Sequence, residues 1–175
     1  MNMLNYFSPR FARALLVLLT AVAFFPALSA GFITWDDPPM VLHNPYYHDL
    51  SPEALYRLFT QPYLSLYQPL TVLTIALQYR IAGVDPFFLH LVNLLLHLGS
   101  VMLAFELARK LGLGTGSAFA AAFLFAVHPS RADSVAWLTE RKDVLFAFFY
   151  LLGLYLHQYN DDPGKNGIRR PVYLC

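Results

Sequence analysis

The sequence predicts an all-α fold, a polytopic membrane helical bundle. Hydrophobic residues make up 57% of the 175 residues and charged residues 13%, whereas soluble domains carry about 25% charged residues. The apolar residues form continuous blocks, which differ from the stripe along one face of a soluble amphipathic helix. Several blocks approach the roughly 20 residues that a helix needs to cross a bilayer.

Four of these blocks are predicted to span the membrane: 11–32, 87–108, 114–130 and 144–159. Ala27 and Ser29 in the first block leave a cleaved signal peptide as an alternative. Residues 69–81 are apolar but short, and segments of about 10–14 residues are more typical of interfacial or buried helices. The block at 114–130 is also short, so the distribution of charge has to decide between the two.

The distribution of Lys and Arg residues decides which of the two short segments spans the membrane. If 69–81 lies at the surface and 114–130 spans, the basic clusters at the ends of the spans all fall on the cytoplasmic side, as the positive-inside rule requires. These cytoplasmic cations are Arg10, Arg13, Arg109, Lys110, Lys165, Arg169 and Arg170. If 69–81 spanned instead, Arg109 and Lys110 would lie outside. We therefore predict cytoplasmic termini, an external loop at 33–86 and a cytoplasmic loop at 161–175.

The external loop is predicted to carry two interfacial helices. Ser51, Pro52 and Glu53 form a helix start, with serine as N-cap and proline at the first helical position, and this helix runs to about Thr60. A second surface helix begins at Pro69. Both are expected to place an apolar face in the membrane interface.

Net charge and cysteine content exclude three further features. A net charge of +1 gives no case for nucleic-acid binding, which requires a clustered basic face. The lone Cys175 excludes an intrachain disulfide and a zinc site built from cysteines.

Two polar clusters carry the functional prediction, because both follow apolar blocks and emerge on the same external face. The first is Trp35-Asp36-Asp37. The second runs from His128 to Asp143 and holds Arg131, Asp133, Glu140, Arg141, Lys142 and Asp143. An interfacial carboxylate can act as a general base or help to hold Mg²⁺ or Mn²⁺. Cations can stabilise a departing phosphate.

At these residues the chain resembles the N-terminal part of a GT-C-fold membrane glycosyltransferase. More narrowly, it resembles protein O-mannosyltransferases with C-terminal tetratricopeptide repeats, including their bacterial relatives. Four motifs carry the resemblance: Phe32 to Asp37 with Asn44-Pro45; Tyr67 to Leu70; His90 to His97; and His128-Pro129 through Ser134–Trp137 to Glu140–Asp143. The resemblance covers the chain to about Tyr159 and implies that residues 1–160 are the first part of a longer transmembrane domain, truncated in the loop at 161–175.

The resemblance implies transfer of a mannose-like sugar from a polyprenyl-phosphate donor to Ser or Thr of an acceptor polypeptide. The reaction would take place at the extracytoplasmic face of a multi-pass membrane protein, in a bacterial inner membrane or its equivalent, and the fragment alone would be inactive. Asp36, Asp37 and Asp143 are implied as catalytic, with Asp36 leading. Arg131, Asp133, Glu140, Arg141 and Lys142 are implied as substrate-binding residues. Asp36 and Asp143 are the candidates for holding any divalent metal.

Three positions depart from the family pattern. Relatives often have His where Arg131 stands, Glu where Asp133 stands and Arg where Gln68 stands. The neutral Gln68 cannot supply a cation. Either phosphate binding shifts to Arg131, Arg141 or Lys142, or the activity of this protein is reduced. His90, Asn93 and His97 share one helix face, where hydrogen bonding between helices is a stronger interpretation than a metal site. A transporter or flippase component and a noncatalytic membrane scaffold remain the alternative functions.

Overall fold

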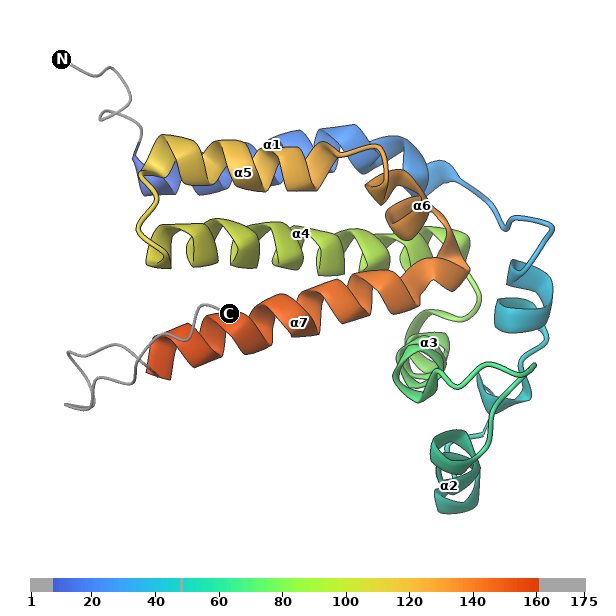
Figure 1. Cartoon of the computed structure of the whole chain (residues 1–175). Coiled ribbons are helices and arrows are strands. Elements are labelled where there is room, and N and C mark those ends of the chain that lie inside the picture. The colour runs from blue at the N-terminus through green and yellow to red at the C-terminus, as the bar shows by residue number, and fades with distance from the viewer. Residues whose placement is uncertain (1–7, 48, 161–175) are drawn as a thin grey trace, which may run out of the picture.

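Four helices lie side by side in a bundle (Figure 1). The computed structural model describes residues 8–47 and 49–160. The bundle consists of α1 (Pro9–Phe24), α4 (Pro86–Lys110), α5 (Thr115–Val127) and α7 (Arg141–Asn160), and α4 contacts the other three helices. The described residues form helices and no strand, which confirms the all-α prediction.

Polar caps set where two of the bundle helices begin. The Ser8 hydroxyl accepts a hydrogen bond of 3.2 Å from the backbone N–H of Phe11, and the Asp85 carboxylate accepts one of 2.9 Å from Phe87. In both helices a proline follows the cap, a position where its missing N–H costs no helical hydrogen bond. The sequence therefore fixes both starts locally.

Among the described residues, two helices are long and apolar enough to cross a membrane. The first is α1 together with the 3₁₀ turn that continues it, Phe25–Ser29. The second is α4. The α-helical part of this first segment ends before Pro26, which cannot donate a helical hydrogen bond. α5 is apolar but has 13 residues, a length of about 20 Å, and α7 contains the block 144–159. The four-span arrangement stays a prediction.

Small residues allow the bundle helices to approach closely. Ala118, Ala122 and Ala126 of α5 follow one another at intervals of four and are at most 1% exposed, so they form one face that packs in the core with α1 and α4. On α4, a Cβ added at Gly99 would lie 2.7 Å from the ring of Phe148 of α7. Close packing through small residues is typical of helices in membranes.

Residues 33–86, here called the cap segment, cover one end of the bundle. The segment contains α2 (Pro52–Thr60) and α3 (Pro69–Ala82), and α3 is seen nearly end-on in Figure 1, so it runs across the bundle. Ser51 caps α2 by accepting a hydrogen bond of 3.2 Å from Ala54 N–H, as predicted. An apolar core lies beneath the cap segment and includes one residue of α4 and one of the 138–140 turn. Its buried members are Val41, Tyr47, Leu58, Val72, Ile75, Ala76, Leu89 and Leu138.

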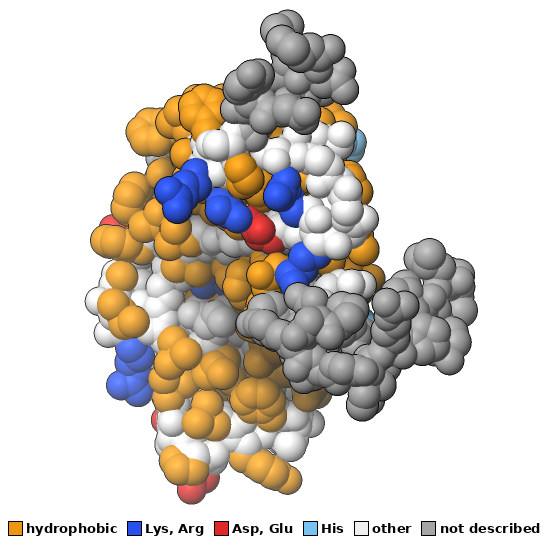
Figure 2. Space-filling model, turned by 90° about the vertical axis from the view of Figure 1, so that its left-hand side faces the viewer, with side chains coloured by type: hydrophobic (Ala, Val, Ile, Leu, Met, Phe, Trp, Pro, Cys, Tyr) orange, Lys and Arg blue, Asp and Glu red, His pale blue; other side chains and the backbone are white. Residues whose placement is uncertain are grey.

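The opposite end of the bundle is basic. Figure 2 shows Lys and Arg side chains gathered around a carboxylate where α1 begins and α4 ends. The cations are Arg10, Arg13, Arg109 and Lys110, and the carboxylate is Glu106. The basic residues at the predicted cytoplasmic ends of α1 and α4 therefore meet in space, far from the cap segment.

Candidate functional site

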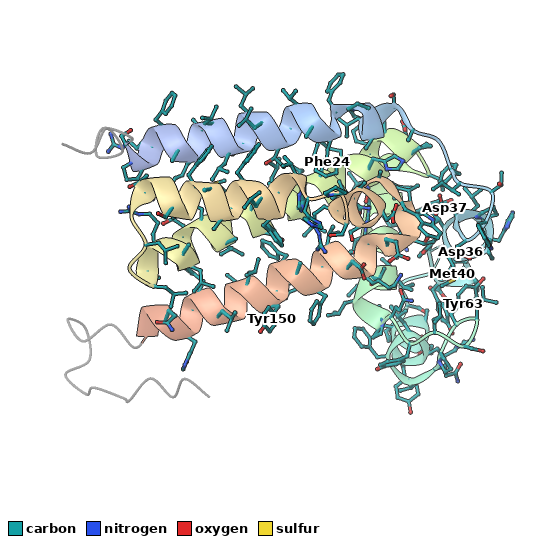
Figure 3. All side chains as sticks on the ribbon, turned by 45° about the horizontal axis from the view of Figure 1, so that its top comes forward. Phe24, Asp36, Asp37, Met40, Tyr63 and Tyr150 are labelled. Carbon is teal, nitrogen blue, oxygen red and sulfur yellow. The ribbon has the colours of Figure 1, made fainter. Side chains whose placement is uncertain are left out.

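The first acidic pair divides into one exposed and one buried carboxylate. Asp37 is fully buried, and its Oδ2 accepts a hydrogen bond of 2.8 Å from the backbone N–H of Ile33. This bond closes the turn that leads into a short π-helical segment, Pro38–Leu42. Asp36 is exposed. Figure 3 shows Asp36, Asp37, Met40 and Tyr63 together at the cap end of the molecule.

Neighbouring side chains of the second cluster point in different directions because they lie where a helix begins. α6 (Arg131–Ala136) and a 3₁₀ turn, Leu138–Glu140, lead into α7 at Arg141. Successive residues of a helix point about 100° apart, so neighbouring charges face different surroundings. Lys142 Nζ lies 2.6 Å from Glu140 Oε1, and both side chains are partly exposed.

One pocket joins the two clusters. It has a volume of about 180 Å³ and brings Asp36 of the first cluster together with Glu140 and Lys142 of the second. The remaining lining residues are Pro39, Met40, Leu64, Leu66, Gln68 and Thr139. The pocket therefore holds an exposed carboxylate, a cation paired with a second carboxylate, and neutral hydrogen-bonding groups.

An apolar groove begins where this pocket ends. The groove has a volume of about 470 Å³ and lies between the start of α3 and the outer face of α7, which exposes Phe146, Phe149 and Tyr150. Tyr150 lies midway along α7 in Figure 3. Lys142 lines both the groove and the polar pocket. The cation of Lys142 therefore lies where the pocket that contains Asp36 meets the apolar groove along α7.

Arg141 is fully buried, which differs from its expected role as a phosphate ligand. Its guanidinium donates to Asn93 Oδ1 at 2.8 Å, to Gln78 Oε1 at 2.8 Å and to the carbonyl oxygen of Leu89 at 2.7 Å. Burial lowers the pKa of Arg141 to about 10, so the group remains charged at neutral pH. Arg141 connects α7 to α3 and α4 and presents no donor to the pocket.

The other predicted ligands lie outside the pocket. Arg131 donates to Ser130 Oγ at 3.2 Å and stands over the ring of Phe125. Asp133 is exposed in the first turn of α6. Asp143 is exposed, and its carboxylate accepts a hydrogen bond of 3.4 Å from Ser134.

The two candidate metal ligands, Asp36 and Asp143, do not line the same pocket, and binding of Mg²⁺ or Mn²⁺ stays a prediction. Asp36 lines the pocket and Asp143 does not. No group of three or more His, Cys, Asp or Glu side chains that could hold a metal ion occurs among residues 8–47 and 49–160.

Two of the three residues on the polar face of α4, Asn93 and His97, link α4 to neighbouring helices. Asn93 accepts from Arg141, and the ring Nε2 of His97 lies 2.9 Å from the carbonyl oxygen of Ala126 on α5. Both contacts join helices, as the preferred interpretation of this face predicted. The hydrogen bond of His97 is buried.

Thr139 is a pocket residue that the sequence analysis did not single out. Its Oγ1 is buried without a hydrogen-bond partner in the described structure, and the residue lines the pocket. Leu64 also lines the pocket. It has a φ of 47°, in the left-handed region that is uncommon for residues other than glycine.

Known proteins give the site a context. Protein O-mannosyl-transferase TMTC1 of Homo sapiens is 32% identical over 173 aligned residues, covering 91% of this chain and 19% of the relative. The chain is homologous to protein O-mannosyl-transferases. Protein O-mannosyl-transferase Tmtc1 of Drosophila melanogaster is 35% identical over 142 residues, covering 77% of this chain and 16% of the relative. Protein O-mannosyl-transferase TMTC3 of Mus musculus is 29% identical over 170 residues, covering 91% and 18%.

The chain spans about a fifth of the length of these curated relatives. No family model matches the chain, and no solved structure matches it.

Proposed function

We propose that the chain forms the donor side of a glycosyltransferase site in a longer membrane protein. The enzyme moves a mannose-like sugar from a polyprenyl phosphate to a Ser or Thr hydroxyl of an acceptor polypeptide. The observation that carries this proposal is the position of Lys142, shared by the pocket that contains Asp36 and the apolar groove along α7.

A lipid-linked sugar has three parts, and each has a counterpart here. The polyprenyl chain is apolar and suits the groove formed by Phe146, Phe149 and Tyr150. The phosphate carries negative charge and suits Lys142. The sugar hydroxyls suit the pocket, which is lined by the polar residues Asp36, Gln68 and Glu140. A charge-assisted contact at the phosphate would fix the position of the anomeric carbon near Asp36.

The reaction follows from these positions. The carboxylate of Asp36 takes the proton of the acceptor hydroxyl as its oxygen forms a bond to the anomeric carbon. The bond from that carbon to the phosphate oxygen breaks, and the polyprenyl phosphate leaves with the bonding electrons. Lys142 stabilises the charge that develops on the leaving group. Arg141 positions α7 from its buried site.

The membrane placement follows the charge distribution. We assign the basic end of the bundle to the cytoplasm and the cap segment to the extracytoplasmic face, with four spans and both termini cytoplasmic. The membrane is a bacterial inner membrane or its equivalent. The complete protein adds the further helices of a GT-C fold and the tetratricopeptide repeats of the family it resembles.

The test compares two neighbouring carboxylates in the complete, membrane-embedded protein. We expect Asp36→Asn to lower sugar transfer by roughly 10²–10⁴-fold, the range of a general base, with unchanged abundance. Asp37→Asn is the matched control, because its amide oxygen can still accept from Ile33 and the residue does not line the pocket. Retained transfer in Asp36→Asn would remove Asp36 from the mechanism.

A second variant separates the enzyme from a scaffold or a flippase component. Lys142→Met should weaken use of the lipid donor by about ten- to a hundredfold, since a hydrogen bond to a charged group contributes about 1.5–3 kcal/mol. Acceptor binding should not change. Steady-state kinetics in which each substrate is varied separately would measure this difference. Absence of sugar transfer in the wild-type complete protein would instead favour a noncatalytic role.

A further inference from the structure

We propose that the basic end of the bundle binds the phosphate head group of an anionic phospholipid. This inference does not depend on the proposed sugar transfer, because it concerns the opposite end of the molecule. The site is a pocket of about 620 Å³ between the start of α1 and the end of α4, at the end shown in Figure 2.

Charge is the first argument. Arg10, Arg13, Arg109 and Lys110 line the pocket with Glu106. These five side chains leave a formal excess of three positive charges. Glu106 pairs with Arg13, whose Nε lies 2.5 Å from Glu106 Oε1. The excess therefore remains to attract an anion, and clusters of Lys and Arg between membrane helices favour anionic lipid head groups.

Two of the pocket cations, Arg109 and Lys110, contact side chains of neighbouring helices. Arg109 Nη1 donates to Thr115 Oγ1 of α5 at 2.5 Å. Lys110 Nζ lies 5.1 Å from the ring centre of Tyr155 on α7. These contacts place charges from the end of α4 beside two neighbouring helices. Because these side chains are already restricted, binding of a phosphate costs less side-chain entropy.

The apolar surface beside the pocket favours a lipid over a free phosphate. α1 exposes Phe11, Leu18 and Val22, with exposed fractions of 57%, 57% and 63%. Their spacing of seven and four residues places them on one face of the helix. Phe11 immediately follows the pocket residue Arg10. A head group in the pocket could therefore extend its acyl chains along α1.

Native mass spectrometry of the intact protein, released from neutral detergent, would test the site. The probes are phosphatidylglycerol, phosphatidylcholine and inorganic phosphate. We expect the wild type to retain phosphatidylglycerol in preference to phosphatidylcholine, with weak binding of inorganic phosphate. Added salt should weaken retention of the anionic lipid, because screening reduces attraction between exposed charges.

The test variant combines Arg10→Gln and Lys110→Gln, and both side chains are exposed. Its affinity for phosphatidylglycerol should fall by about thirtyfold, since each cation near an anionic membrane surface contributes about fivefold. The matched control combines Arg57→Gln and Arg80→Gln, two exposed cations of the cap segment, and should bind as the wild type does.

Three outcomes would overturn the proposal. The first is equal retention of phosphatidylglycerol by the test variant and the wild type. The second is equal retention of phosphatidylcholine and phosphatidylglycerol by the wild type. The third is inorganic phosphate binding as tightly as the lipid, which would make the pocket a site for a free anion. None of these readouts depends on sugar transfer.

Discussion

Replacing Arg141 distinguishes a buried structural cation from a donor ligand. Arg141→Ala would remove three hydrogen bonds, leaving the Asn93 and Gln78 side-chain oxygens and the Leu89 carbonyl without their donor. These partners are neutral, so the cost comes from buried acceptors left without a donor and from the cavity that the lost side chain leaves. At about 1–3 kcal/mol for each unsatisfied acceptor, we expect a total loss of about 3–5 kcal/mol. Arg141→Lys keeps the charge but loses the forked geometry, so we expect an intermediate loss.

Thermal unfolding of the purified protein in detergent would measure the effect. For a chain of about 150–250 residues, 1 kcal/mol corresponds to roughly 2–4 °C, so Arg141→Ala should lower the Tm by about 6–20 °C. Lys142→Ala is the matched control, because its partly exposed ion pair with Glu140 contributes about 0–1 kcal/mol.

The two neighbouring variants should therefore have opposite phenotypes. Arg141→Ala should lose stability, whereas Lys142→Ala should keep its Tm and lose donor use in the complete protein. A wild-type Tm for Arg141→Ala together with weakened donor use would refute the reasoning. That result would mean that the guanidinium reaches the donor, as the sequence alone indicated.

Two further predictions concern topology and packing. In a cysteine-free background, Trp35→Cys should react with an impermeant thiol reagent in intact cells and Leu113→Cys should not; the reverse pattern would contradict the assigned orientation. Gly99→Ala should destabilise the protein by about 1–3 kcal/mol, because the new Cβ meets Phe148 at 2.7 Å. Gly153→Ala, whose Cβ meets nothing within 4 Å, is the matched control, and equal Tm values for the two variants would contradict the close packing of α4 and α7.

Local sequence signals were sufficient to predict where α2 and α3 begin, but not the short helix α6 within the second cluster. Ser51 before Pro52 predicted the start of α2, and Pro69 predicted α3; the structure confirms both starts. Pro26 was a missed signal, because it ends the α-helical part of the first span near Phe24. Capping and proline effects depend on residues close in sequence, which is why they can be read without a structure.

The site was predictable only in outline. The sequence placed two acidic clusters on one face, and the structure joins them through Asp36, Glu140 and Lys142. It could not show that Asp37 and Arg141 turn inward, because the direction of each side chain depends on where a turn closes or a helix begins. A shift of one position at the start of α7 would rotate Arg141 by about 100°.

The ion pair between Lys142 and Glu140 has a consequence for selectivity. An entering lipid would find one N–H donor of the ammonium group already engaged at 2.6 Å, and its phosphate would compete with the carboxylate for this cation. An uncharged lipid cannot replace the attraction between Lys142 and Glu140, whereas a negatively charged phosphate can. The exchange would also release Glu140 into the pocket that contains Asp36, so that arrival of the correct lipid would change the charge surrounding the acceptor.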